Sequence, residues 1–333
     1  MIKVAALTAN RPDPTSRFRF RQFIEPLGAY GIDVSEHYLR MTRYRRQPLA
    51  SLALLLRLPG VIASRRADIT WFRRELIPER VTLERFTGGK RLFDVDDAIW
   101  LLGKSDYSER IVARCDGVIA GNRFLAKYYQ KVGKPVWIVP TAVDTEIWKP
   151  DRRPDDGVWT LGWIGSRSNL RFITGIERPL AAFLGDHPDS RLRVVCDRPP
   201  DFKMIPPKSW EYVKWTAESE VAMTQGMDVG LMPLEDSDWA RGKCAFKMLQ
   251  YMSVGLPVVV TPVGVNQELL ELDELGFGPK SDNEWYDDLK KLYADRVLGE
   301  GMGAAGRAIV EENYSIEVNA AKLAKIFHEV AGK

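Results

Sequence analysis

The chain has 333 residues, of which 45% are hydrophobic and 28% charged, and this globular composition excludes disordered, collagen-like and low-complexity proteins. The formal net charge is only +3, but residues 1–150 contain 26 Lys and Arg against 16 Asp and Glu (+10), whereas residues 151–333 contain 22 against 29 (−7). Since this length exceeds what one core usually supports, length and charge together predict two domains with different partners.

The first half of the chain alternates short apolar runs with helical patterns. Helices are expected at residues 18–30 and 49–64, and between most of the later apolar runs. Because strands joined by crossover helices form parallel sheets covered on both faces, this half predicts an α/β domain. Its strands are expected at residues 2–7, 32–37, 69–72, 90–94, 117–120 and 136–139.

A polar segment at residues 149–157, with two prolines and one glycine, predicts a domain boundary near residue 150. The alternation then restarts, so the expected fold class is α/β with two such domains. Ligands of open α/β sheets bind at the carboxyl ends of the strands, so we expect the functional site in a cleft between the domains. The second set of strands is expected at 160–164, 191–196, 212–214, 229–232 and 257–261, with helices near 171–184, 218–225, 242–253, 284–298 and 315–330.

Several kinds of site are excluded. The three cysteines stand in unrelated contexts without a CxxC motif, and the three histidines are scattered, so we expect no disulfide framework, no metal site and no histidine base. The first apolar run is too short for a signal peptide, and no run of about 18 apolar residues occurs. We therefore expect a cytoplasmic protein.

The most informative segment is residues 239–270. Lys243, Lys247 and Gln250 follow one another at spacings that place them on one face of the expected helix. An apolar strand and a turn at Gly264 into a second helix come next. Helix N-termini beside lysines favour an anion, and the alternative is a solvated lysine face.

Residues 249–260, LQYMSVGLPVVV, followed by Gly264 and Glu268, resemble the donor-binding signature of retaining glycosyltransferases of family 4, also called glycosyl transferases group 1. Three shorter segments resemble further parts of that family in the same order, at residues 115–122, 138–144 and 312–315. The resemblance implies the GT-B fold, in which two Rossmann-like α/β domains face a central cleft.

The resemblance also implies a domain organisation. It predicts an acceptor-binding domain at residues 1–150, a nucleotide-sugar-binding domain at 151–315, and a C-terminal helix at 316–333 that crosses back to the first domain.

Two glutamates of the family signature are replaced here. The second, which holds the donor ribose in the family, falls on Gln250, whose amide could still form hydrogen bonds, and Glu268 matches the last motif glutamate. The first, which contacts the transferred sugar, falls on Gly242, so the identity of that sugar stays open.

The two cations that grip the donor diphosphate in the family are also altered. Its arginine falls on Ser166, directly after Gly165, and its lysine falls near Arg171. Because a diphosphate needs at least two cations or helix termini, Lys243 or Lys247 is expected to replace the missing one. The alternative for Arg171 is a surface helix residue.

Asp94, Asp96 and Asp97 follow an apolar strand. An Asp-x-Asp pair suits Mg²⁺ or Mn²⁺, as in glycosyltransferases of the other main fold, GT-A. The GT-B resemblance instead places Asp96 beside the acceptor or the transferred sugar, with Asp97 contacting the acceptor. Helix capping by Asp96 or Asp97 is the alternative.

Arg17 and Arg21 are one helical turn apart in the first expected helix, so they could meet an acceptor phosphate or the donor diphosphate. The alternative is a basic, solvated turn.

The apolar helix at 48–66 has basic flanks, at Arg40, Arg43, Arg45 and Arg46, so it predicts either contact with an anionic membrane surface or a buried crossover helix. The GxGxxG at 301–306 follows a helix rather than a strand, so we expect no dinucleotide site there.

The resemblance therefore implies a retaining glycosyltransferase of polysaccharide biosynthesis that moves a sugar from a nucleotide-diphosphate sugar to a glycan or lipid-linked acceptor. Lys243 and Lys247, with Asp96 and Arg17, are the expected catalytic residues, and no metal, further cofactor or nucleic acid is expected. A cytoplasmic location is predicted, with the inner membrane surface as an added site. The alternatives are a metal-dependent transferase using Asp94 and Asp96, and a non-enzymatic protein that binds nucleic acid or an anionic surface.

Overall fold

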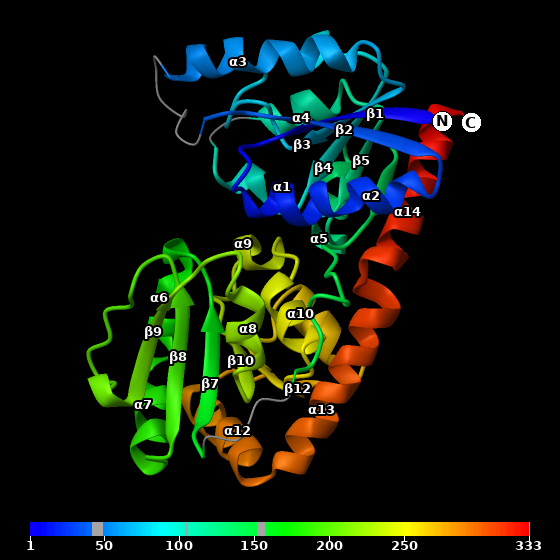
Figure 1. Ribbon diagram of the computed structural model, residues 1–333. Coiled ribbons are helices and arrows are strands. Elements are labelled where there is room, and N and C mark those ends of the chain that lie inside the picture. Colours follow the sequence, from blue (N-terminus) through cyan, green and yellow to red (C-terminus); the bar gives the residue numbers. More distant parts are fainter. Residues whose placement is uncertain (42–48, 104–105, 152–156, 333) are drawn as a thin grey trace. The chain divides into compact units, whose positions relative to one another are not determined.

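The computed structural model describes residues 1–41, 49–103, 106–151 and 157–332. The chain divides into two compact units, which we call the first and the second unit (Figure 1). The first unit comprises Met1–Ala142, Arg241–Cys244 and Tyr314–Lys333, and the second comprises Val143–Ala240 and Ala245–Asn313. The domain bounds expected from the sequence, at residues 150 and 315, are not tested by this division and stay a prediction.

The first unit is built on a parallel sheet with strand order β2-β1-β3-β4-β5-β6. The order reverses at β1, so the carboxyl ends of β1 and β3 flank the position where α/β sheets bind ligands. The strands are β1 (Ile2–Thr8), β2 (Ile32–Tyr38), β3 (Ile69–Arg73), β4 (Lys90–Val95), β5 (Gly117–Ala120) and β6 (Val136–Ile138). The helices are α1 (Pro14–Arg19), α2 (Ile24–Gly28), α3 (Leu49–Ser64), α4 (Tyr107–Val112), α5 (Arg123–Gln130) and α14 (Ile316–Ala331).

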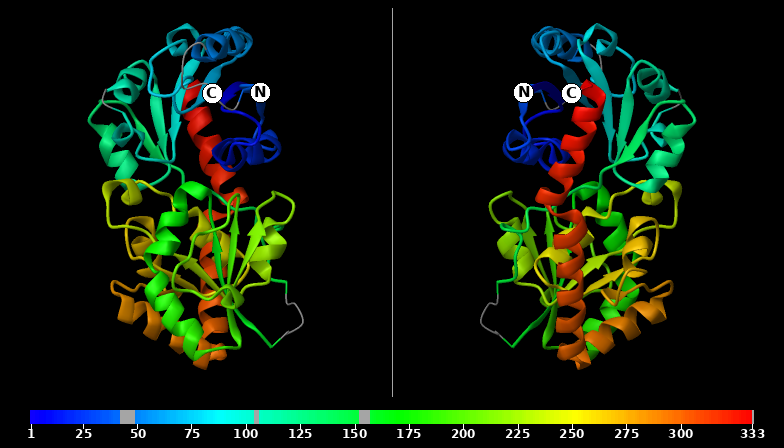
Figure 2. Two further views of the ribbon diagram at one scale, coloured as in Figure 1. Left: turned by 90° about the vertical axis from the view of Figure 1, so that its left-hand side faces the viewer. Right: turned by 90° about the vertical axis from the view of Figure 1, so that its right-hand side faces the viewer.

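The last helix, α14, completes the core of the first unit. Phe327 of α14 lies against the buried Trp71 of β3, with ring centroids 5.3 Å apart, and the Phe20 ring lies tilted against Trp71, with centroids 4.1 Å apart. Both ends of the chain consequently lie in this unit (Figure 2). The apolar face of α14 explains why the last 20 residues return to the first unit.

The second unit is built on a second parallel sheet, with strand order β12-β11-β10-β7-β8-β9. Its order reverses between β7 and β10. The strands are β7 (Trp159–Ile164), β8 (Ser190–Cys196), β9 (Trp210–Lys214), β10 (Val229–Met232), β11 (Val258–Val260) and β12 (Gly276–Phe277). The helices are α6 (Leu170–Gly175), α7 (Glu177–Asp186), α8 (Glu220–Gln225), α9 (Asp238–Arg241), α10 (Phe246–Ser253), α11 (Val265–Leu270), α12 (Asp282–Ala294) and α13 (Arg296–Ile309).

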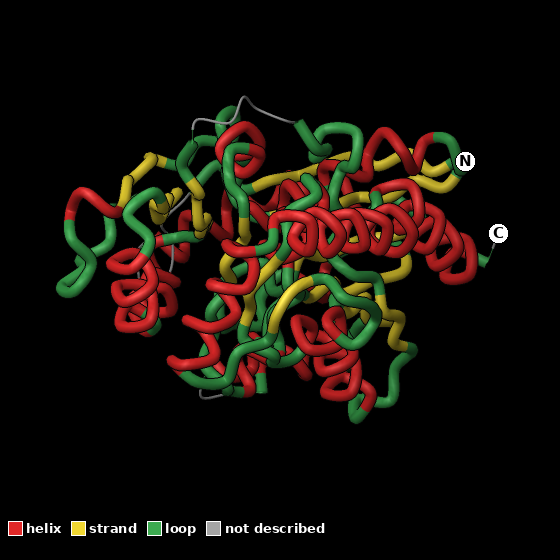
Figure 3. The backbone as a smooth tube through the Cα atoms, turned by 90° about the horizontal axis from the view of Figure 1, so that it is seen from below, coloured by secondary structure: helices red, strands yellow, loops and turns green. Residues whose placement is uncertain are grey.

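The expected fold class is confirmed, since the strands of both sheets lie among helices (Figure 3). Each expected strand is present within two residues of its predicted bounds, and only the two-residue β12 was missed. The GxGxxG motif lies inside α13. There a Cβ on Gly303 would lie 1.9 Å from the Gly255 carbonyl oxygen, so that glycine permits close packing of α13.

Several helix predictions were wrong in their bounds. The helix expected at 18–30 is broken at Phe20, which ends α1 and precedes a 3-10 turn and α2. The helix expected at 284–298 is two helices, because the Asp295 carboxylate caps α13 at the Leu298 N–H. The helix expected from residue 242 begins only at Phe246. Arg43, Arg45, Arg46 and residues 152–156 of the expected linker lie outside the described residues.

Candidate functional site

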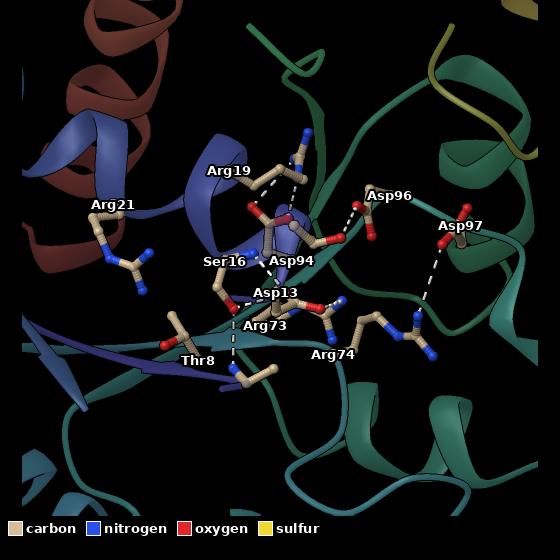
Figure 4. Close-up of polar contacts among 12 residues, drawn as sticks. Thr8, Asp13, Ser16, Arg19, Arg21, Arg73, Arg74, Asp94, Asp96 and Asp97 are labelled. Carbon is tan, nitrogen blue, oxygen red and sulfur yellow. Dashed lines mark hydrogen bonds and ion pairs between the residues drawn. The ribbon is translucent and has the colours of Figure 1, made fainter. Parts of the chain in front are cut away.

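The carboxyl edge of the first sheet is organised by a buried ion pair. Arg19 donates to both carboxylate oxygens of Asp94, at 2.5 and 3.2 Å (Figure 4). Trp71 Nε1 donates to the same carboxylate at 3.1 Å. Burial raises the pKa of Asp94, and the Arg19 guanidinium opposes that shift. Both oxygens of the Asp94 carboxylate therefore accept hydrogen bonds from the protein itself.

Asp96 and Asp97 extend from the end of β4 toward different partners. Thr15 donates to Asp96 Oδ2 at 2.8 Å, whereas Asp96 Oδ1 is buried and accepts no hydrogen bond from the described residues. Asp97 Oδ2 lies 3.8 Å from Arg74 Nη1 (Figure 4). Burial and the Asp96 carboxylate raise the pKa of Asp97 to about 6, while Lys243 and Arg74 oppose the rise. The following 3-10 turn begins at Ala98 without a side-chain cap, so the capping alternative is not supported.

Most arginines at this edge of the first sheet are matched by carboxylates. Arg21 forms two hydrogen bonds to Glu36, at 2.8 and 2.7 Å. It lies beyond the end of α1, so it does not extend the helical face of Arg17. Arg17 lies in α1 with its guanidinium 4.6 Å from the Phe18 ring centroid. The +10 charge of the first half is therefore not concentrated at this edge.

Sequence reasoning missed two arginines at the end of β3. Arg73 pairs with Asp13, with Nε 3.0 Å from Oδ2, and Arg74 lies between Glu75 and Asp97. Arg74 has φ of 57°, an unusual left-handed conformation that often marks a functional site. Two consecutive arginines directly after an apolar strand were the available signal.

Lys243 belongs to the first unit, in the Arg241–Cys244 segment. It precedes α10 and acts on Asp97, whose pKa it lowers. The prediction that Lys243 shares a helical face with Lys247 and Gln250 was therefore wrong, because Ala245 takes a left-handed conformation (φ 51°) and the helix starts after it.

In the second unit, Lys247 and Gln250 form a pair on α10. Lys247 Nζ donates to Gln250 Oε1 at 2.8 Å. Gln250 is fully buried, yet its Nε2 has no hydrogen-bond partner among the described residues. A buried amide donor without a partner costs about 1–3 kcal/mol unless a ligand satisfies it.

The other residues expected to bind the donor have partners other than Lys247 and Gln250. A Cβ on Gly165 would lie 2.4 Å from the Trp163 ring, so glycine is required directly after β7. The exposed Ser166 hydroxyl contacts the Ser168 hydroxyl at 2.8 Å. Arg171 is exposed and lies 3.9 Å from Glu235 Oε2, which fits the surface alternative. Glu268 is exposed in the first turn of α11.

The chain was compared with known proteins. Residues 163–295 match the family model described as glycosyl transferases group 1. The fold is similar to sucrose-phosphate synthase from Thermosynechococcus elongatus, with a TM-score of 0.72 and 15% identity over 100% of both chains. It is also similar to Anabaena HepE in complex with UDP and glucose, with a TM-score of 0.72 and 14% identity over 99% of this chain and 100% of that one.

A third similar structure is WaaG, a glycosyltransferase involved in lipopolysaccharide biosynthesis, with a TM-score of 0.67 and 12% identity over 98% of this chain and 99% of that one. The comparison with curated protein sequences gives no match. Within the described ranges, no helix combines the length and apolarity needed to cross a membrane. Residues 163–295 therefore form a glycosyl transferases group 1 domain, and the chain is a glycosyltransferase enzyme with the GT-B fold.

Proposed function

We propose that this enzyme is a retaining, metal-independent glycosyltransferase of family 4 that uses a nucleotide-diphosphate sugar. The observation that supports donor binding is the buried Gln250 Nε2, which has no partner among the described residues and stands beside Lys247 at the start of α10. A ribose hydroxyl would satisfy that amide, and the Lys247 ammonium would face the diphosphate. HepE, of similar fold, has been seen with UDP and glucose, which suits a donor of that class.

In the proposed reaction, the bond between the anomeric carbon and the diphosphate oxygen breaks, and the nucleoside diphosphate leaves. The acceptor oxygen forms its bond to the same face of the sugar, and its proton passes to a phosphate oxygen of the leaving group. Lys243 and Lys247 stabilise the charge that develops on the diphosphate. No side-chain base is needed.

The remaining expected residues keep narrower roles in this proposal. Gly165, Ser166, Arg171 and Glu268 are proposed to contact the donor. Asp96, Asp97 and Arg17 are proposed to contact the acceptor or the transferred sugar, and the buried Asp96 Oδ1 offers an acceptor for a sugar hydroxyl. Arg21 is paired with Glu36 and is not part of this proposal.

A thermal-shift panel tests donor binding, because a ligand that binds only the folded state raises its stability. We expect one nucleoside diphosphate and its nucleotide sugar to raise Tm without added metal and with a chelator present. Gln250→Leu should abolish most of that shift, whereas Gln250→Glu, which restores the family residue, should keep it. The absence of any shift across UDP, GDP, ADP and their sugars would contradict the proposal.

We also propose that the acceptor is lipid-linked and that α3 binds an anionic membrane surface in the cytoplasm. The helix has a buried face that includes Ala53 and Val61, and its only charged residue, Arg57, is buried. The solvent-facing side exposes six large apolar side chains and no charge: Leu49, Leu52, Leu55, Leu56, Leu58 and Ile62. Exposed Arg65 and Arg66 directly follow the helix in sequence, and exposed Arg40 precedes it at a greater distance along the chain, which suits anionic lipid.

Vesicle flotation tests the membrane proposal. The enzyme should float with phosphatidylcholine vesicles that contain phosphatidylglycerol and not with phosphatidylcholine alone. Ile62→Asp should lower binding about tenfold, since it removes a large apolar side chain that is 61% exposed. Val297→Asp, at a position that is 77% exposed in the second unit, is the matched control and should bind like the wild type. Equal loss in both variants, or binding to neither vesicle, would contradict the proposal.

A further inference from the structure

Asn122 stands directly after β5 and uses both ends of its side-chain amide. Its Oδ1 accepts a hydrogen bond from the Leu125 N–H at 2.9 Å, which caps α5. Its Nδ2 faces the backbone carbonyls of Arg241, Gly242 and Lys243, at 3.3, 3.1 and 3.0 Å. These four contacts fix the orientation of the amide, because the reversed side chain would direct its oxygen at three carbonyl oxygens.

The three carbonyls belong to one short loop, Arg241–Cys244, that the second half of the chain contributes to the first unit. Two glycines make room for it. A Cβ on Gly121 would lie 2.4 Å from Cys244 Sγ, and a Cβ on Gly242 would lie 2.6 Å from the Ala98 Cβ. Cys244 Sγ donates to the Asp96 carbonyl oxygen at 3.3 Å. Gly121 and Asn122 therefore form the surface against which the loop packs, and we call this surface the seat of the loop.

The seat determines where Lys243 stands. Asn122 Nδ2 donates to the carbonyl of Gly242, before Lys243, and to the carbonyl of Lys243 itself. The Lys243 ammonium opposes the rise in the pKa of Asp97, at the end of β4. The chain then leaves the loop through Ala245, whose left-handed backbone (φ 51°) ends the seat before α10 begins. The backbone at Lys243 is thus constrained by the loop and not by a helix.

We propose that Asn122 is a positioning residue for glycosyl transfer, which holds the Arg241–Cys244 loop on the first unit and thereby places Lys243 for its action on the donor diphosphate. The activity part of this inference rests on the role proposed for Lys243. The claim that Asn122 holds the loop does not depend on that role, and it is tested separately by the labelling of Cys244.

Selective thiol labelling measures the seat directly. All three cysteines are buried free thiols, and Cys115 and Cys196 lie outside the loop, so they serve as internal controls. Asn122→Ser keeps a hydroxyl that can cap α5 and removes the donor to the three carbonyls. We expect Cys244 to react with a maleimide about tenfold faster in this variant, with Cys115 and Cys196 unchanged.

Activity on the same variant tests the consequence. Asn122→Ser should lower kcat for transfer about tenfold at saturating acceptor, while Tm stays close to that of the wild type. Ser281→Ala, which removes the equivalent cap from α12 in the second unit, is the matched control and should leave kcat and Cys244 labelling unchanged.

Three outcomes decide the inference. Faster labelling of Cys244 alone with lowered kcat supports it. If all three cysteines react equally faster, or if no rate changes, Asn122 does not hold the loop, whatever the value of kcat. Faster Cys244 labelling with unchanged kcat overturns the link between the loop and catalysis, but neither the role proposed for Lys243 nor glycosyl transfer itself.

Discussion

The carboxyl edges of the two sheets handle charge in opposite ways. In the first unit, Arg19, Arg21 and Arg73 each meet a carboxylate, at Asp94, Glu36 and Asp13. In the second unit, Lys247 contacts a neutral amide, and that amide keeps a buried donor with no partner among the described residues. The edge of the first sheet thus pairs its arginines with carboxylates and leaves a buried acceptor, Asp96 Oδ1, without a partner among the described residues, whereas the second unit leaves a buried donor, Gln250 Nε2.

The largest expected effect concerns stability of the first unit. Asp94→Asn leaves the Arg19 guanidinium buried without a counter-charge, and we expect the free energy of unfolding to fall by about 3–5 kcal/mol. Glu36→Gln removes the partner of Arg21, whose side chain is 29% exposed, and should cost only about 0–1 kcal/mol. Urea unfolding measures both. Equal losses would mean that the two ion pairs do not differ as their burial implies.

The next effect concerns the proposed donor site on α10. Lys247→Ala should keep the fold, because Lys247 lies at the surface end of α10, and should lower kcat/KM for transfer about 100-fold, since one cation facing the leaving diphosphate is lost. Lys208→Ala removes an exposed lysine from the same unit and is the matched control. Initial rates of nucleoside diphosphate release measure both variants. Unchanged turnover in Lys247→Ala would exclude the proposed donor site.

The sequence predicted the two sheets well, because parallel strands buried on both faces leave continuous apolar runs such as Val258–Val260. It also predicted that Lys247 and Gln250 lie together, because both residues belong to one helix and helical spacing is a local pattern. It failed at Lys243, whose position depends on the left-handed Ala245 and on Asn122, more than a hundred residues earlier in the chain. No local pattern records that contact.

The Asp94–Asp96 metal hypothesis stays untested, but the contact that bears on it could not be predicted from the sequence either. The spacing Asp-x-Asp is visible in the sequence, but the partner that occupies Asp94 comes from α1, 75 positions away. Arg19 itself stood between the two arginines that the sequence singled out, and it is buried at the end of α1, next to the break at Phe20 that the helical spacing did not reveal.

The smallest expected effect concerns Asp97, a carboxylate at the edge of the first sheet whose pKa is raised in spite of the nearby cations. Its pKa of about 6 reflects burial and Asp96, opposed by Lys243, Arg74 and Arg73. Because the folded state holds this proton more tightly than the unfolded chain, the contribution of Asp97 to stability is greatest below about pH 4 and is lost as pH rises to about 6. Asp97→Asn should therefore unfold with a flatter dependence on pH across that window.

The same group should appear in the pH profile of transfer. If the ionised Asp97 contacts the acceptor, kcat/KM should fall to half near pH 6 and continue to fall below it, and Asp97→Asn should remove that limb. Lys243→Ala removes a charge that lowers the pKa of Asp97, so the limb should move to higher pH, whereas Lys208→Ala should leave it in place. A limb that stays at the same pH in Lys243→Ala would show that Lys243 does not stand beside Asp97 in the working enzyme.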